Sequence, residues 1–239
     1  MATAFDVISA VANASDDAAA AHAAEYFTSG GEYGQGDVFL GVSIPAARTI
    51  AKRFAHLSPD EIDVLLESEV HEHRMVALLI LVLQYRVSTS AASGKRIVDQ
   101  YLEAAHAGRV NNWDLVDASA EFLVGDYYFD RPRNTFFSLA KSDSLWERRI
   151  AIVGTLGFIK RGDASTTLEI AEKLLREKHD LIQKAVGWML REVGKRVDRA
   201  LLIAFLDDNA GRMPRTMLSY AVEHLDDAQK VHYRAAART

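Results

Sequence analysis

Trp113 and Asp117 are the first candidates for chemistry, because they stand four residues apart in a segment with helical periodicity. Residues at this spacing share one face of an α-helix. At about 100° per residue, that face lies away from the apolar stripe of the segment, which consists of Leu115, Val116, Ser119, Phe122 and Leu123. A large aromatic ring and a carboxylate are thus presented together outside the predicted core. The alternative is that Trp113 packs against a neighbouring helix and Asp117 pairs with a local arginine, because most aromatic residues serve packing.

A second segment combines an aromatic ring with positive charge. Trp188 points away from the apolar stripe of its helix and is grouped with Lys184, Arg191 and Lys195. That stripe is formed by Ile182, Ala185, Val186, Met189 and Val193. Such a face suits contact with a sugar beside paired phosphates. An inter-repeat tryptophan covered by lysine stems is the alternative.

Arg149 introduces a cation into an otherwise apolar face. At helical spacing it falls among Ile152, Val153 and Leu156, and a cation in apolar surroundings needs a partner. Either a carboxylate pairs with it inside the protein, or its side chain reaches past the rim of the helix to a phosphate. The sequence leaves both interpretations open.

Metal, nucleotide and thiol chemistry lack their usual patterns. His71 and His73 stand two residues apart and so do not share a helix face, which argues against a metal site. The glycine-rich stretch at 30–36 is not followed by the Gly-Lys-Ser/Thr of a P-loop. Cysteine is absent, which excludes a thiolate nucleophile and a cysteine-based zinc site. We therefore expect neither a metal nor a cofactor.

Composition and terminal sequence predict a cytoplasmic protein with no membrane partner. A chain without cysteine suits a reducing compartment. Residues 1–20 contain no basic residue, whereas the first part of a signal peptide is positively charged. The longest apolar run, at 75–83, is too short to span a bilayer.

Charge is unevenly distributed along the chain. The net charge of −5 argues mildly against nucleic-acid binding, but residues 1–147 hold 11 basic and 21 acidic residues, whereas residues 148–200 hold 12 basic and 7 acidic ones. A local basic stretch can supply phosphate contacts even in an acidic chain. The alternative is that these charges form solvated helix faces.

Helical signals run through the chain and strand signals are nearly absent. Arg74, Trp113, Arg149 and Trp188 mark apolar helical segments at spacings of 39, 36 and 39 residues. A period of about 40 residues is typical of HEAT and armadillo repeats. We therefore predict an all-α, HEAT-like/ARM-like helical-repeat solenoid over residues 1–239, a single domain whose concave side can embrace a duplex.

Local signals predict individual helix boundaries. Ser58 followed by Pro59, Ser144 and Asp163 are placed to cap the helices that follow them. The glycines in 29–37 predict a structured loop between an N-terminal helical pair and the rest of the chain.

Six stretches, in this order, resemble the AlkD-type DNA alkylation repair family over nearly the whole chain. They are Tyr26-Phe27, Tyr33 to Val42, Asn112 to Asp117, Leu145 to Arg149, Ile182 to Glu192, and Met213 to Leu218. The resemblance implies a stack of HEAT-like helical pairs with a concave DNA-binding groove. Some family members carry an aromatic residue where this chain has Asn112, a departure that bears on substrate breadth.

The resemblance also implies roles for particular residues. The family's catalytic aspartate matches Asp117, and its two groove tryptophans match Trp113 and Trp188. A groove arginine matches Arg149, and a tyrosine near the lesion matches Tyr26. Further DNA-binding residues are expected at Arg148, Lys184, Arg191, Lys195 and Arg215.

The family implies a DNA glycosylase of base excision repair, and we expect it to act as a monomer. Its substrates are N3- and N7-alkylated purines in duplex DNA, which it removes without base flipping. These bases are cationic, so that the leaving group needs no general acid. The carboxylate of Asp117 is expected to stabilise the oxocarbenium ion that develops on the deoxyribose, with Trp113 and Trp188 flanking the sugar.

Two competing interpretations remain open at the level of sequence. A HEAT-like scaffold that binds DNA or a protein partner without catalysis would share the repeat pattern, because a fold does not imply a function. A glycosylase for bulky or cross-linked adducts would also suit an open groove.

Overall fold

The computed structural model describes residues 2–28 and 36–236, and most of these residues are helical. The only extended pairing there is an isolated parallel bridge between Val38 and Val70. The all-α prediction is therefore confirmed. The loop predicted over residues 29–37 lies outside the described residues except for Gly36 and Asp37. Within the described ranges, no helix combines the length and apolar character needed to cross a bilayer.

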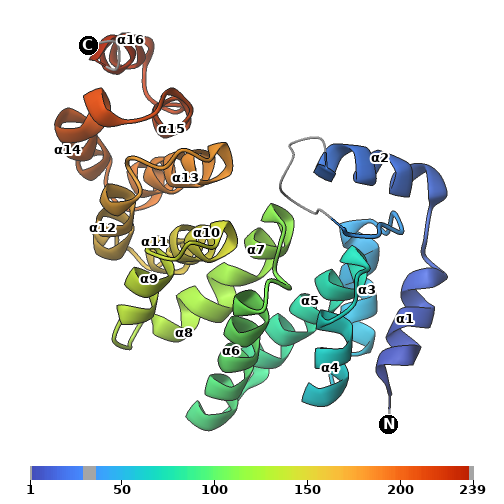
Figure 1. Cartoon of the computed structure of the whole chain (residues 1–239). Coiled ribbons are helices and arrows are strands. Elements are labelled where there is room, and N and C mark those ends of the chain that lie inside the picture. The colour runs from blue at the N-terminus through green and yellow to red at the C-terminus, as the bar shows by residue number, and fades with distance from the viewer. Residues whose placement is uncertain (1, 29–35, 237–239) are drawn as a thin grey trace. The chain divides into compact units, whose positions relative to one another are not determined.

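The chain divides into two compact units, residues 1–119 and 120–239. The first unit is built around α5 (His71–Val87), which packs against α1, α3, α4 and α6 (Figure 1). Because it is surrounded, the first 12 residues of α5 are all buried, charged side chains included. The other helices of this unit are α1 (Ala4–Ala12), α2 (Asp17–Thr28), α3 (Ile44–Arg53), α4 (Pro59–Leu66), α6 (Ala91–His106) and α7 (Trp113–Ala120).

The second unit is built around α13 (Asp180–Arg196), which contacts α10, α11, α12, α14 and α15. The apolar stripe predicted for this helix is buried, as expected. The other elements are η1 (Glu121–Gly125), α8 (Asp126–Tyr128), α9 (Asn134–Leu139), α10 (Leu145–Gly154), α11 (Leu156–Ile159), α12 (Ser165–Lys173), α14 (Arg199–Asn209), η2 (Ala210–Arg212), α15 (Arg215–Ala221) and α16 (Asp227–Ala236).

The structure confirms the predicted helix starts at Ser58 and Ser144, and it places the third start one residue later than predicted. Ser58 is the N-cap of α4, with Pro59 as the first helical residue. The Ser144 side chain accepts a hydrogen bond from a backbone N–H at the start of α10. The N-cap of α12 is Ala164 rather than Asp163, although the Asp163 carboxylate accepts a hydrogen bond of 2.8 Å from the Ser165 N–H at the start of this helix.

The helix that begins at Trp113 changes its winding after α7. It continues as η1, a π-helical turn, which is wider than an α-helical turn and shifts the register of the residues beyond it. Four members of the predicted stripe are buried, namely Leu115, Val116, Ser119 and Leu123. Phe122 is only half-buried, whereas Glu121 is buried and pairs with Lys160 at 2.5 Å. The prediction that Phe122 belongs to the stripe was wrong because it assumed an unbroken α-helix.

Close packing between α13 and α15 depends on the absence of a side chain at Gly187. A Cβ atom at this position would lie 2.3 Å from the Met217 carbonyl oxygen and 2.6 Å from the Tyr220 Cβ atom. Both neighbours belong to the helix backbone or are attached directly to it, so that neither can move alone. Gly187 thus sets the distance between the two helices.

We expect Gly187→Ala to lower the free energy of unfolding by about 1–3 kcal/mol, the usual effect of overpacking. The matched control is Gly94→Ala in α6, where the nearest atoms, the Ser88 hydroxyl oxygen and a ring carbon of Tyr85, would both be 3.5 Å from the new Cβ. Alanine has the higher helix propensity, so this control should gain about 0.5–1 kcal/mol. Urea unfolding of both variants measures the difference, and equal effects at the two positions would contradict the packing argument.

Candidate functional site

In the first unit, Trp113 lies at the start of α7 and is surrounded by aromatic rings from α2. Its ring centroid is 5.6 Å from that of Phe27 and 6.4 Å from that of Tyr26. Trp113 is half-buried, while Tyr26 is 57% exposed. The structure therefore brings together two of the predicted site residues, Tyr26 and Trp113, from distant parts of the sequence. Phe27, whose role was not foreseen, lies on α2, and its ring contacts that of Trp113 at the start of α7.

Asp117 lies one turn beyond Trp113 on α7 and is half-buried. Its negative charge acts on Tyr101, which is fully buried in α6. Burial raises the pKa of the Tyr101 hydroxyl well above its usual value, and the charge of Asp117 raises that pKa further, although the hydrogen bond from Ser119 lowers it. Tyr101 is therefore a neutral phenol beneath α7 at physiological pH.

The first turn of α7 is capped by side chains next to Trp113. The buried Asn112 side chain accepts a hydrogen bond of 2.8 Å from the Trp113 N–H. One carboxylate oxygen of Asp114 accepts a hydrogen bond of 2.8 Å from the Leu115 N–H. These contacts satisfy backbone donors that a helix start leaves without a partner. Asn112 therefore has a structural role in this chain, because its side chain caps the first turn of α7.

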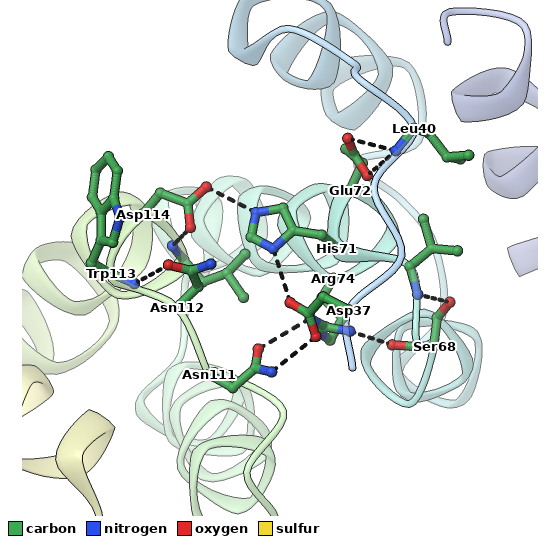
Figure 2. Close-up of polar contacts among 12 residues, drawn as sticks. Asp37, Leu40, Ser68, His71, Glu72, Arg74, Asn111, Asn112, Trp113 and Asp114 are labelled. Atoms are coloured by element: carbon green, nitrogen blue, oxygen red, sulfur yellow. Dashed lines mark hydrogen bonds and ion pairs between the residues drawn. The ribbon is translucent and has the colours of Figure 1, made fainter. Parts of the chain in front are cut away.

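The second carboxylate oxygen of Asp114 contacts His71, which belongs to a buried cluster of charged side chains (Figure 2). His71 bridges two carboxylates, with its Nε2 atom 2.9 Å from Asp114 and its Nδ1 atom 3.3 Å from Asp37. Arg74 donates to the same Asp37 oxygen at 2.5 Å and to the Asn111 side-chain oxygen at 3.1 Å. Asn111 in turn donates to the other Asp37 oxygen at 3.0 Å. Two cations thus face two carboxylates.

The cluster shifts the pKa values of its members. Burial lowers the pKa of His71, but the hydrogen bonds to Asp114 and Asp37 outweigh burial and raise that pKa to about 9. Burial raises the pKa of Asp37, but hydrogen bonds from His71, Asn111 and Arg74 outweigh it, so that this pKa is lower than usual. At neutral pH, His71 is therefore an imidazolium between two carboxylates.

Aromatic rings cover the His71 ring. Its centroid lies 4.9 Å from the Phe39 ring and 5.4 Å from the Phe27 ring, both in stacked orientations. Rings in this position attract a cation through their electron-rich faces. The same Phe27 ring also contacts Trp113. Phe27 therefore packs against both the charged cluster and the candidate site.

In the second unit, Trp188 and Lys184 are half-buried on α13, and Lys195 is exposed. Lys184 pairs with Asp180 at 2.7 Å, and Arg191 pairs with Glu223. Arg191 and Lys195 also line a hollow of about 440 Å³ at the C-terminal end of this helix. The three predicted basic residues of α13 are thus half-buried or exposed, and two of them, Lys184 and Arg191, are in ion pairs.

The remaining predicted residues have different environments. Arg149 is 5% exposed and donates a hydrogen bond of 2.7 Å to the Leu181 carbonyl, in the first turn of α13. Arg148 pairs with Glu177 at 2.7 Å. Arg215 is exposed at the start of α15. Arg149 is thus a buried arginine that ties α10 to α13.

Sequence reasoning did not foresee the cluster of Asp37, His71, Arg74, Asn111 and Asp114. His71 was considered only as a metal ligand, and its two carboxylate partners are 34 and 43 residues away in the sequence. The one usable signal was a set of charged residues at the start of a long apolar helix, since buried charges require partners. In the described part of the chain, no three acidic or histidine side chains are grouped as a metal ion would require.

A family model described as DNA alkylation repair enzyme matches residues 7–225. The solved structure of a predicted DNA alkylation repair enzyme from Enterococcus faecalis is similar, with a TM-score of 0.70 and 18% identity over 89% of this chain and 97% of that chain. At this identity the likeness shows the fold, and it confirms a helical-repeat architecture. No curated protein matches the chain.

The raised pKa of His71 predicts a pH-dependent contribution to stability. The histidine pKa rises from 6.5 to about 9 on folding, so that the charged form is favoured in the folded protein. This stabilisation is complete below pH 6.5 and is lost as the pH rises through about 9. The difference in Tm between the wild type and His71→Gln should therefore shrink over this interval, as thermal unfolding at stepped pH would show.

His73→Gln is the matched control, because His73 is buried in the same helix and burial lowers its pKa. A group with a lowered pKa is almost entirely neutral in both states from about pH 7.5, one unit above the unfolded value, so its contribution should stay constant from there upward. A constant difference for His71→Gln over the same interval would contradict the prediction.

Proposed function

The chain belongs to the DNA alkylation repair enzyme family, and on this premise we propose that it is a DNA glycosylase. It hydrolyses the N-glycosidic bond of N3- and N7-alkylated purines in duplex DNA. The observation that carries the proposal is the pair of Trp113 and Asp117, one turn apart on α7 and both half-buried, with the exposed Tyr26 ring beside Trp113.

The chemistry of the substrate explains why a single carboxylate suffices. A purine alkylated at N3 or N7 carries a positive charge, so that the electron pair of the breaking C1′–N bond neutralises the leaving base. Positive charge then develops on the deoxyribose, and a carboxylate placed near C1′ stabilises it. Water adds to C1′ and transfers a proton to Asp117 or to solvent. A general acid is not needed.

We assign the aromatic side chains to the sugar. Trp113 would contact the deoxyribose as it becomes cationic, an interaction worth roughly 0.5–2 kcal/mol. The same role is proposed for Trp188, which is supported by its half-buried position among basic residues on α13. Tyr26 would contact the DNA next to the lesion.

We assign the basic side chains of the second unit to phosphates, which fix the register of a protein on a duplex. Lys195 and Arg215 are exposed and suited to this role. Lys184, Arg191 and Arg148 would exchange their carboxylate partners for phosphate oxygens. Arg149 is buried, and its hydrogen bond to the Leu181 carbonyl suits it to holding the start of α13 beneath the DNA.

The proposal includes three further features. The enzyme acts without flipping the damaged base, so that selection depends on the lability of the cationic base. It acts as a monomer, and it acts in the cytoplasm within base excision repair. Binding to methylated duplex DNA without release of any base would instead support the non-catalytic scaffold.

We expect Asp117→Asn to lower the rate of 7-methylguanine release at least about 10²-fold, because one electrostatic contact to the transition state is lost. Affinity for the duplex should stay close to that of the wild type, because the substitution does not touch a phosphate-binding group. Single-turnover base release and fluorescence anisotropy measure the two quantities.

The matched control for this variant is Asp99→Asn, which removes an exposed carboxylate of α6 that pairs with Lys95 at 2.6 Å. Base release should be unchanged in the control. Equal activity of the wild type and Asp117→Asn would remove Asp117 from the mechanism.

Substrate charge provides a second test of the mechanism. A duplex that contains hypoxanthine, a neutral lesion, should release its base far more slowly than one that contains 7-methylguanine, because the neutral base leaves as an anion without a proton donor. Both duplexes are compared by base analysis under the same conditions. Efficient excision of hypoxanthine would refute the charge-based selection.

A further inference from the structure

We propose that His71 is a positioning residue for the proposed reaction, because it holds the first turn of α7, and with it Trp113, by bridging Asp114 and Asp37. The inference rests on the proposed function for its kinetic consequence. The bridge itself is read directly from the contacts in Figure 2, where His71 lies between the two carboxylates.

The bridge needs both ring nitrogens of His71 as donors. Asp114 and Asp37 are carboxylates, and an ionised carboxylate only accepts hydrogen bonds. A neutral imidazole donates through one nitrogen and presents a lone pair at the other. Loss of the proton would therefore turn one of the two contacts, at 2.9 Å or 3.3 Å, into a repulsive contact between acceptors.

Residues on both sides of Trp113 in the sequence are bound to the charged cluster. The residue after it, Asp114, binds His71, while Asn111, two residues before it, binds Asp37 and Arg74. Asp37 receives hydrogen bonds from Arg74 and Asn111 as well as the contact with His71. The loop that leads into α7 and the first turn of α7 are thus fastened to α5 through one cluster.

The charges that face the His71 ring come from three segments. Asp114 lies on α7, Arg74 lies on α5 itself, and Asp37 directly precedes Val38 in the sequence. From α2 and the segment after Val38, the neighbours are the uncharged rings of Phe27 and Phe39. Two carboxylates against one arginine favour the imidazolium form, in agreement with a pKa of about 9.

The kinetic test compares His71→Gln with His73→Gln. Glutamine has one donor group, so it can serve only one of the two carboxylates. A small displacement of catalytic groups lowers rates strongly, and we expect base release by His71→Gln to fall about 10- to 100-fold at saturating enzyme, with unchanged affinity for the duplex.

His73 is the matched control because it is buried in the same helix, and its ring is hydrogen-bonded to the Ser68 hydroxyl at 2.8 Å rather than to α7. His73→Gln should keep the wild-type rate. An equal loss in both variants would show a general effect of altering α5 and would overturn the proposal.

A spectroscopic test does not depend on activity. The aromatic ¹³C–¹H resonances of Trp113, assigned with a Trp113→Phe variant, should shift in His71→Gln and stay unchanged in His73→Gln. In the wild type they should move with a midpoint near pH 9, where His71 loses its proton. Trp113 resonances that are the same in the wild type, in His71→Gln and in His73→Gln would overturn the proposal.

Asp114→Asn tests whether the bridge depends on the second proton of His71. The introduced amide can donate to a neutral Nε2 atom while Nδ1 donates to Asp37, so that the bridge no longer needs the second proton. We expect wild-type-like Trp113 resonances without the transition near pH 9. Resonances that resemble those of His71→Gln would count against the bridge.

The two hypotheses can fail separately. If the wild type releases no alkylated base, the proposed function fails, while the resonances still report whether His71 positions Trp113. If base is released but the resonances and rates do not distinguish His71→Gln from His73→Gln, only the positioning role fails.

Discussion

A buried imidazolium between two carboxylates determines how α7 is held in the first unit. His71, Asp37, Arg74 and Asp114 bring two positive and two negative charges into a region where none is well solvated. Removing such charges from water is expensive, and they are tolerated only when each is paired and hydrogen-bonded. Removal of His71 would take away the cation that pairs with the Asp114 carboxylate, whereas Asp37 would keep its contacts with Arg74 and Asn111. The cluster therefore specifies one arrangement of α5, α7 and the segment around Asp37.

The two units use a buried cation in comparable ways. In the first, His71 and Arg74 of α5 bind groups next to Trp113 at the start of α7. In the second, Arg149 of α10 binds the Leu181 carbonyl at the start of α13, the helix that carries Trp188. In each case a cation from an earlier helix fastens the first turn of a helix that carries a tryptophan. The spacing of 39 residues from Arg74 to Trp113 and from Arg149 to Trp188 thus has a structural meaning beyond repeat length.

Much of the helical architecture was predictable because its causes are local. Capping residues and apolar stripes depend on neighbours within a few positions, and the helix starts at Ser58 and Ser144 and the buried face of α13 followed from them. The failure at Phe122 is instructive for the same reason. Whether the helix widens into a π turn after Ala120 depends on how it packs. A prediction that places residues at 100° per residue assumes a regular α-helix and cannot detect such a turn.

The sequence by itself determined that Trp113 and Asp117 share a helix face, because four residues make about one turn wherever the helix lies. It also determined the all-α class and the family resemblance. Only the tertiary structure decided that Tyr26 lies beside Trp113, and that Asp114 meets His71 across 43 residues of sequence. Contacts at such separations depend on how helices pack, and one chain's residue spacing does not record which distant side chains will be buried together.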